Sequence, residues 1–200
     1  MLRRASELNG YTLGARDGEF GTVGDFYFDD RSWTVQHLVA HTGKWLSDRL
    51  VLVPSAALHP VNHDKRLIPV DLTKEEIENS ASPPVGRSSR QPPHLRSIWA
   101  ITGCHLQAED GELGHIEDFV IDDEAWIIRY LIVDTRNWWP GKRVLLAPQW
   151  VARVNWTDSK VWVALHRDTI EQAPEYTADA PITRAYEAAL YRHYQREQYW

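Results

Sequence analysis

Acidic residues cluster at two turn-like positions, one in each half of the chain. The clusters are Asp25, Asp29 and Asp30, and Asp118, Asp122, Asp123 and Glu124. Hard cations bind clustered oxygen ligands, so each cluster could hold a metal ion. However, the alternating acids and closing glutamate of an EF-hand are absent. Aspartate also favours turns, because its side chain accepts hydrogen bonds from nearby backbone amides. We therefore interpret both clusters as structural turns and predict no metal.

The histidines and the single cysteine are the other candidates for chemistry. His37 and His41 lie on one predicted strand, roughly 13 Å apart at a rise of about 3.3 Å per residue, too far apart to chelate one ion. Cys104 has no helix N-terminus or basic cluster beside it that would lower its thiol pKa, so we interpret it as a small apolar residue. Nucleophile-elbow, phosphate-loop and dinucleotide motifs are absent. We expect no catalytic residue and no cofactor, and hence not an enzyme.

Two tryptophan-containing loops are the best candidates for a binding surface. Exposed tryptophan beside lysine or arginine is typical of an interaction hot spot. The candidate partner surface consists of Trp45, Trp138, Trp139, Lys142 and Arg143. The alternative is that Trp45 and Trp138, which occupy equivalent positions in the two halves, plug the end of the fold, since tryptophan is mostly buried. Trp139 has no aromatic equivalent and is expected to be exposed.

Composition excludes several classes of protein. The chain has 200 residues, of which 43% are apolar, and a net charge of −6 without a basic block. Nucleic-acid binding needs clustered lysine and arginine, so we consider it unlikely. One cysteine cannot form an intramolecular disulfide, and the N-terminal residues lack the apolar run of a signal peptide. No stretch reaches the ~18 apolar residues that a membrane helix needs. We expect a cytoplasmic protein without a membrane span.

An internal repeat gives the domain plan. Shifting the sequence by 93 residues, the distance from Asp17 to Asp110, aligns its two halves almost without gaps. The aligned pairs include Asp17-Gly18 with Asp110-Gly111, Gly21 with Gly114, Asp25-Phe26 with Asp118-Phe119, Asp29-Asp30 with Asp122-Asp123, Trp33 with Trp126, and Thr42 with Thr135. Residues 80–95 are rich in proline and serine and read as an exposed linker. We predict one repeat over residues 1–79, a second over 96–174, and a C-terminal helical segment over 175–200.

Each repeat is expected to consist of short strands and tight turns. The Asp-Gly pairs predict turns in which glycine has positive φ. Strands are predicted over residues 22–28, 33–41, 49–53 and 67–70, with counterparts over 115–121, 126–133, 143–146 and 160–165. A capping box at residues 73–76 predicts a short helix. This pattern predicts a mainly β protein with two tandem small β-barrels.

The C-terminal segment and one strand of the second repeat suggest an additional packing surface. Residues 181–200 carry Ile182, Tyr186, Leu190, and His193 or Tyr194 at helical spacing, which predicts one amphipathic helix. The outer face of strand 126–133 carries Ile127, Arg129, Leu131 and Val133. Such an apolar face needs a cover, which could be the first repeat, the C-terminal segment or a second subunit. We predict a homodimer in which the second repeat or the C-terminal helix takes part.

The ordered set of repeated motifs resembles the PRC-barrel family. It consists of Asp17 to Gly21, Asp25-Phe26, Asp29-Asp30, Trp33, Thr42, Trp45 and Val51-Leu52, each with a counterpart in the second repeat. The resemblance is to stand-alone bacterial tandem forms, and it implies small β-barrels used for assembly and binding, without family-wide catalytic residues. The function expected is a non-enzymatic binding or assembly module that acts through protein–protein contacts. The alternatives are an RNA- or ribosome-associated maturation factor and an accessory protein of a membrane electron-transfer complex.

Overall fold

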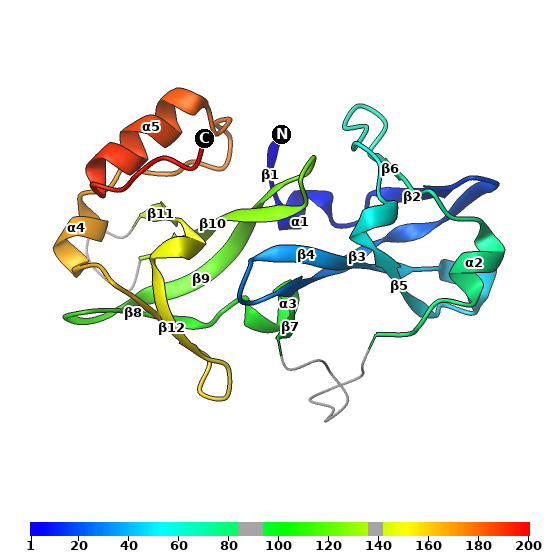
Figure 1. The fold of residues 1–200 in the computed structure, drawn as a ribbon, viewed down its shortest axis with the longest axis horizontal. Coiled ribbons are helices and arrows are strands. Elements are labelled where there is room, and N and C mark those ends of the chain that lie inside the picture. The colour runs from blue at the N-terminus through cyan, green and yellow to red at the C-terminus, as the bar shows by residue number, and fades with distance from the viewer. Residues whose placement is uncertain (84–93, 136–141) are drawn as a thin grey trace. The chain divides into compact units, whose positions relative to one another are not determined.

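The chain forms two compact units, each built mainly from β-strands (Figure 1). This computed structural model describes residues 1–83, 94–135 and 142–200. Unit 1 comprises Met1, Arg3–Ala100 and Ile121–Ile128, and unit 2 comprises Leu2, Ile101–Val120 and Arg129–Trp200. The predicted mainly β fold is confirmed. The predicted linker over residues 80–95 lies largely outside the described residues.

Most secondary-structure elements of the first half recur in the same order in the second. The first half contains β1 (Leu2–Arg4), α1 (Ala5–Leu8), β2 (Thr12–Ala15), β3 (Gly18–Asp29), β4 (Thr34–His41), η1 (Gly43–Leu46), β5 (Leu50–Pro54), η2 (Ser55–Ala57), β6 (Leu67–Pro69) and α2 (Lys74–Glu78). The second contains β7 (Leu95–Ser97), α3 (Ile98–Ile101), β8 (His105–Ala108), β9 (Gly111–Asp122), β10 (Ile127–Asp134), β11 (Arg143–Leu146), η3 (Pro148–Trp150), β12 (Val151–Asn155), β13 (Lys160–Val163), α4 (Arg167–Glu171) and α5 (Arg184–His193). Thus β2, β3, β4 and α2 each begin 93 residues before β8, β9, β10 and α4.

Unit 1 is organised around β3 and β4, which pair antiparallel along most of their length. Strand β5 extends the sheet beside β4, β2 and β7 pair antiparallel with β3, and β6 pairs parallel with β2. The core between these strands includes the fully buried side chains of Leu13, Phe28, Val35 and Ile68. Among the described strands, the order ends at β6, so the sheet is not closed. The expectation of closed barrels is therefore not met. Strand β6 has three residues and ends at Pro69, which lacks an amide to extend a ladder.

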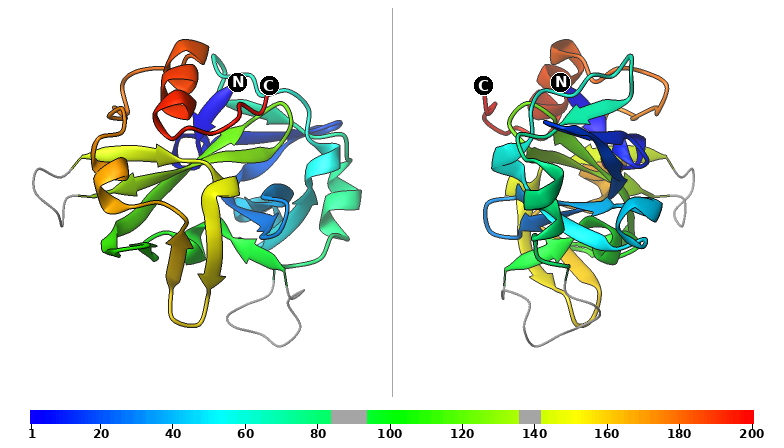
Figure 2. Two further views of the ribbon diagram at one scale, coloured as in Figure 1. Left: turned by 60° about the vertical axis from the view of Figure 1, so that its left-hand side comes forward. Right: turned by 90° about the vertical axis from the view of Figure 1, so that its right-hand side faces the viewer.

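Unit 2 has the same pairing pattern in β8, β9, β10 and β11, and β13 pairs parallel with β8. Strands β12 and β13 form an antiparallel hairpin, seen in yellow in Figure 2. Within the chain, Leu131 and Val133 are fully buried and Ile127 is partly buried. The apolar face that motivated the homodimer is thus covered without a second subunit.

The C-terminal helix is shorter than predicted and packs through an unexpected residue. It covers Arg184–His193 rather than 181–200, because the side chain of Thr183 caps its first turn by accepting from the Tyr186 amide at 3.2 Å. The helix ends before Gln195, which has a φ of 51°. Its buried face includes Leu190, as expected, but also Glu187, which periodicity treats as a polar surface residue.

Local turn chemistry follows the sequence closely. Gly18 and Gly111 have φ values of 131° and 144°, which confirms the predicted positive φ. The capping box of α2 is present, with Glu76 accepting from the Thr73 amide at 2.7 Å. Trp33 and Trp126 lie in the turns before β4 and β10, with φ values of 56° and 54°, rather than within the strands.

Candidate functional site

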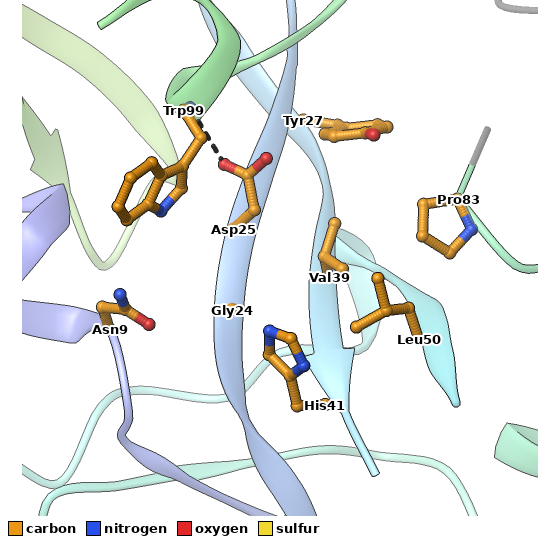
Figure 3. Close-up of a pocket in the computed structure, with 9 residues that line it drawn as sticks. All are labelled: Asn9, Gly24, Asp25, Tyr27, Val39, His41, Leu50, Pro83 and Trp99. Atoms are coloured by element: carbon orange, nitrogen blue, oxygen red, sulfur yellow. Dashed lines mark hydrogen bonds between the residues drawn. The ribbon is translucent and has the colours of Figure 1, made fainter. Parts of the chain in front are cut away.

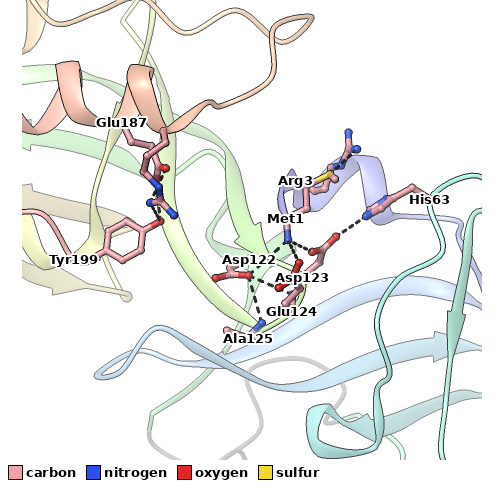
Figure 4. Close-up of polar contacts among 10 residues, drawn as sticks. Met1, Arg3, His63, Asp122, Asp123, Glu124, Ala125, Glu187 and Tyr199 are labelled. Atoms are coloured by element: carbon pink, nitrogen blue, oxygen red, sulfur yellow. Dashed lines mark hydrogen bonds and ion pairs between the residues drawn. The ribbon is translucent and has the colours of Figure 1, made fainter.

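The repeated acidic residues accept hydrogen bonds from nearby backbone amides in both units. The carboxylate of Asp25 accepts from the Phe26 amide at 2.7 Å, and that of Asp118 accepts from the Phe119 amide at 2.8 Å. In unit 1, Asp123 also lies 2.6 Å from the Nε2 atom of His63 (Figure 4). Among the described residues, no three histidine, cysteine, aspartate or glutamate side chains are grouped so that they could hold a metal ion. The contacts seen for these carboxylates are hydrogen bonds to groups within the fold.

Of the described residues of the predicted partner surface, Trp45 is exposed, whereas Lys142 and Arg143 bond other residues of the chain. Trp45 lies in η1 and is 40% exposed, with the Lys74 ammonium 5.7 Å from its ring centroid. Arg143 forms an ion pair with Glu117, and the Lys142 ammonium donates to the Ala173 carbonyl at 2.6 Å. Trp138 and Trp139 lie outside the described residues.

A pocket of about 440 Å³ opens on unit 1 beside strands β3, β4 and β5 (Figure 3). Four of its lining residues are apolar or aromatic side chains buried or half-buried in the wall, and a tryptophan lies at its edge. The lining comprises Asn9, Gly24, Asp25, Tyr27, Val39, His41, Leu50, Pro83 and Trp99. We call this site the Trp99 pocket.

The two repeats differ in two residues that line the Trp99 pocket. Its wall contains Gly24 and Leu50, and the positions 93 residues later hold Glu117 and Arg143. In unit 2 these two side chains form a two-pronged ion pair, at 2.5 and 2.6 Å. Unit 1 lacks both long side chains, so the corresponding space is open. Gly24 also lies against the His41 imidazole, where a Cβ atom would overlap the ring.

Asp25 is the acidic group of the pocket, and it holds the tryptophan in place. Its carboxylate accepts from the hydroxyl of Ser97, from the Phe26 amide and from the Trp99 amide at 3.2 Å. The bonds from Ser97 and Trp99 anchor the end of β7 and the start of α3 to β3. Burial raises the pKa of the Asp25 carboxyl above its ordinary value, although the three hydrogen bonds act in the opposite direction. Burial, and then the charge of Asp25, raises the pKa of Tyr27.

Trp99 is 64% exposed, an unusual state for so large an apolar side chain. In Figure 3 its indole extends from α3 at the edge of the pocket, near Asn9 and Asp25. Trp99 was not among the site residues predicted from the sequence. The repeat could have pointed to Trp99, because the equivalent position in the first repeat holds Ser6. A tryptophan at this position is therefore not required by the repeated fold.

Comparison with known proteins identifies one domain. Residues 2–77 match the PRC-barrel domain. This domain is a general protein-interaction module. No curated protein matches the chain. The match covers most of the pocket's lining, whereas Pro83 and Trp99 come from beyond it. Among the described residues, no helix is both long enough and apolar enough to cross a membrane.

Proposed function

We propose that this chain is a non-enzymatic protein-interaction module, and that it binds its partner at the Trp99 pocket. The observation that carries the proposal is the 64% exposed indole of Trp99 at the edge of a pocket with apolar walls. A rigid aromatic side chain beside a concave apolar surface provides a large contact area at a low cost in conformational entropy. The PRC-barrel match over residues 2–77 favours the same class of function.

The burial of Cys104, the candidate nucleophile, favours a binding role over catalysis. Cys104 is buried, and burial raises the pKa of its thiol, which keeps the sulfur in its unreactive protonated form. Asp25 already accepts three hydrogen bonds, and those from Ser97 and Trp99 join β7 and α3 to β3, which is a positioning role. We therefore retain the proposal that the protein is not an enzyme.

We further propose that residues 96–174 are a second copy of the PRC-barrel unit, as in stand-alone bacterial tandem forms. The constant offset of 93 residues between equivalent elements supports this duplication. A cytoplasmic location also stays a proposal, based on the single cysteine.

The homodimer stays a proposal that must rest on a surface other than the buried Leu131 and Val133. Light scattering at micromolar concentration tests it. A mass of twice 23.1 kDa would support the dimer, and a mass of 23.1 kDa would reject it.

Affinity purification of the tagged chain from cells that naturally express it tests the proposed site. We expect Trp99→Ala to lose a stoichiometric protein partner that the wild type retains. Trp45→Ala is the matched control, because it removes another exposed tryptophan of unit 1 outside the pocket. Recovery of the partner with Trp99→Ala at the wild-type level would overturn the proposed site.

A further inference from the structure

We propose that the Trp99 pocket receives an arginine side chain of the partner protein, with its guanidinium group beside Asp25. This inference rests on the proposed function and names the chemistry that the pocket recognises. Three features support it: the arrangement of the second repeat, the charge of the pocket, and the shape and chemistry of its walls.

The second repeat shows which side chain suits this part of the fold. Strand pairing places Leu50 opposite His41 in unit 1, and Arg143 opposite Asp134 in unit 2. The register is therefore the same in both repeats. In unit 2, the guanidinium of Arg143 bonds both carboxylate oxygens of Glu117, which lies on the neighbouring strand β9. Unit 1 lacks both members of this pair, because Leu50 and Gly24 stand at the two positions. A partner's arginine would therefore need another acceptor there, and Asp25, next to Gly24 in the lining, is the carboxylate that can provide it.

The charge of the pocket favours a cation. Asp25 is the acidic residue of the lining, and its carboxylate has about four acceptor positions, of which three are used by Ser97, Phe26 and Trp99. One position remains for a further donor. A neutral apolar occupant would bury this carboxylate more deeply without compensation, whereas a guanidinium would form a charge-assisted hydrogen bond. The other titratable groups of the lining are His41 and Tyr27, and His41 opposes a cation only when it is protonated.

The walls complement the other parts of an arginine side chain. Val39, Leu50 and Pro83 provide an apolar surface for its methylene stem. The face of the Trp99 indole can stack on a planar guanidinium, which is more favourable than contact with the more strongly hydrated ammonium of lysine. The pocket therefore combines an acceptor, an apolar wall and an exposed aromatic ring.

Titration with small probes tests the inference, with backbone and indole N–H signals followed by nuclear magnetic resonance. The probe is Nα-acetyl-arginine amide, and its matched control is Nα-acetyl-citrulline amide, which has nearly the same shape without the charge. We expect the arginine probe to shift the signals of Trp99 and Leu50 saturably, and to bind about tenfold more tightly than the citrulline probe. Asp25→Asn should reduce the affinity for arginine to that for citrulline.

A second variant tests whether the pocket itself is the site. Leu50→Arg places the proposed side chain in the pocket from within the chain, so it should abolish binding of the arginine probe. Ala56→Arg introduces the same residue at another exposed position of unit 1 that does not line the pocket, and it should leave binding unchanged. Spectra with the wild-type dispersion of amide signals would show that both variants are folded.

The outcomes separate this inference from the proposed function. Equal affinity for the two probes, or an unchanged affinity for arginine in Asp25→Asn, would overturn the recognition of arginine. If the arginine probe fails to bind but partner recovery still depends on Trp99, the inference fails and the proposed function stands. If partner recovery is independent of Trp99, the proposed function fails.

Discussion

Removing one hydroxyl group should substantially weaken the docking of α5 in unit 2. Tyr130 is fully buried on β10, and its hydroxyl donates to the Glu187 carboxylate at 2.7 Å. Glu187 is 2% exposed and also accepts from the Tyr199 hydroxyl at 2.8 Å, as Figure 4 shows, while the Arg184 guanidinium lies 2.9 Å away. Burial, and then the bond to Glu187, raises the pKa of Tyr130, so this hydroxyl stays protonated and donates.

The Tyr130→Phe substitution removes this donor and leaves the buried carboxylate with fewer partners. A hydrogen bond to a charged group contributes about 1.5–3 kcal/mol, so we expect a loss of about 2 kcal/mol in the free energy of unfolding. For a chain of this length the loss corresponds to a fall of roughly 4–8 °C in Tm. Urea titration followed by tryptophan fluorescence and thermal scans measure the two quantities.

Tyr186→Phe provides the matched control on the same helix. The Tyr186 hydroxyl donates to the Pro174 carbonyl at 3.1 Å, a neutral acceptor, so its loss should cost about 1 kcal/mol or less. Tyr199→Phe should also cost less than Tyr130→Phe, because the side chain is only partly buried and water can replace the hydroxyl. A loss in Tyr130→Phe no larger than in Tyr186→Phe would refute the role assigned to buried Glu187.

Four further predictions concern other parts of the chain. Gly114→Ala should destabilise unit 2 by about 1–3 kcal/mol, because a Cβ atom would overlap the Asp134 carbonyl; an unchanged urea midpoint would contradict this. Thr73→Ala should cost about 1 kcal/mol by removing the cap of α2, measured in the same titration. Asp25 has a raised pKa in the folded state, so protonation of its carboxyl favours the folded protein. This contribution to stability is present at low pH and is lost as the pH rises from about 3.8 toward the pKa of the folded state. The Tm of Asp25→Asn should therefore rise relative to that of the wild type across this interval, and a constant difference in Tm would contradict the prediction. Cys104 should react with iodoacetamide much more slowly in the native protein than in urea, as mass spectrometry can measure.

The parts of the fold that could be predicted depend on local chemistry. Gly18 and Gly111 adopt positive φ because a turn requires it, and their Asp-Gly context identifies that turn. The capping box at Thr73 likewise lies within four residues. Because the two halves repeat, a turn or strand predicted in one half is also expected at the equivalent position of the other. Closure of the strands into barrels could not be predicted in this way, because it depends on which strand edges meet.

The Trp99 pocket depends on contacts that no local pattern contains. Asp25 bonds the Trp99 amide across 74 residues of sequence, and this contact positions the backbone of Trp99 beside the pocket. The buried Glu187 similarly depends on Tyr130, 57 residues away. The tryptophans predicted from the sequence to bind a partner were instead those near lysine or arginine, such as Trp45. Comparing the repeats for positions that differ, such as Gly24 with Glu117, would have pointed toward the pocket.

Site-specific photo-crosslinking tests the central claim most directly. The photoreactive residue p-benzoylphenylalanine would replace Trp99 in one protein and Trp45 in another, both irradiated in cells that naturally express the chain. The account predicts a covalent adduct to one protein species from position 99, identified by mass spectrometry, and no such adduct from position 45. The same adduct from both positions, or an adduct to RNA from position 99, would contradict a protein-binding site at the Trp99 pocket.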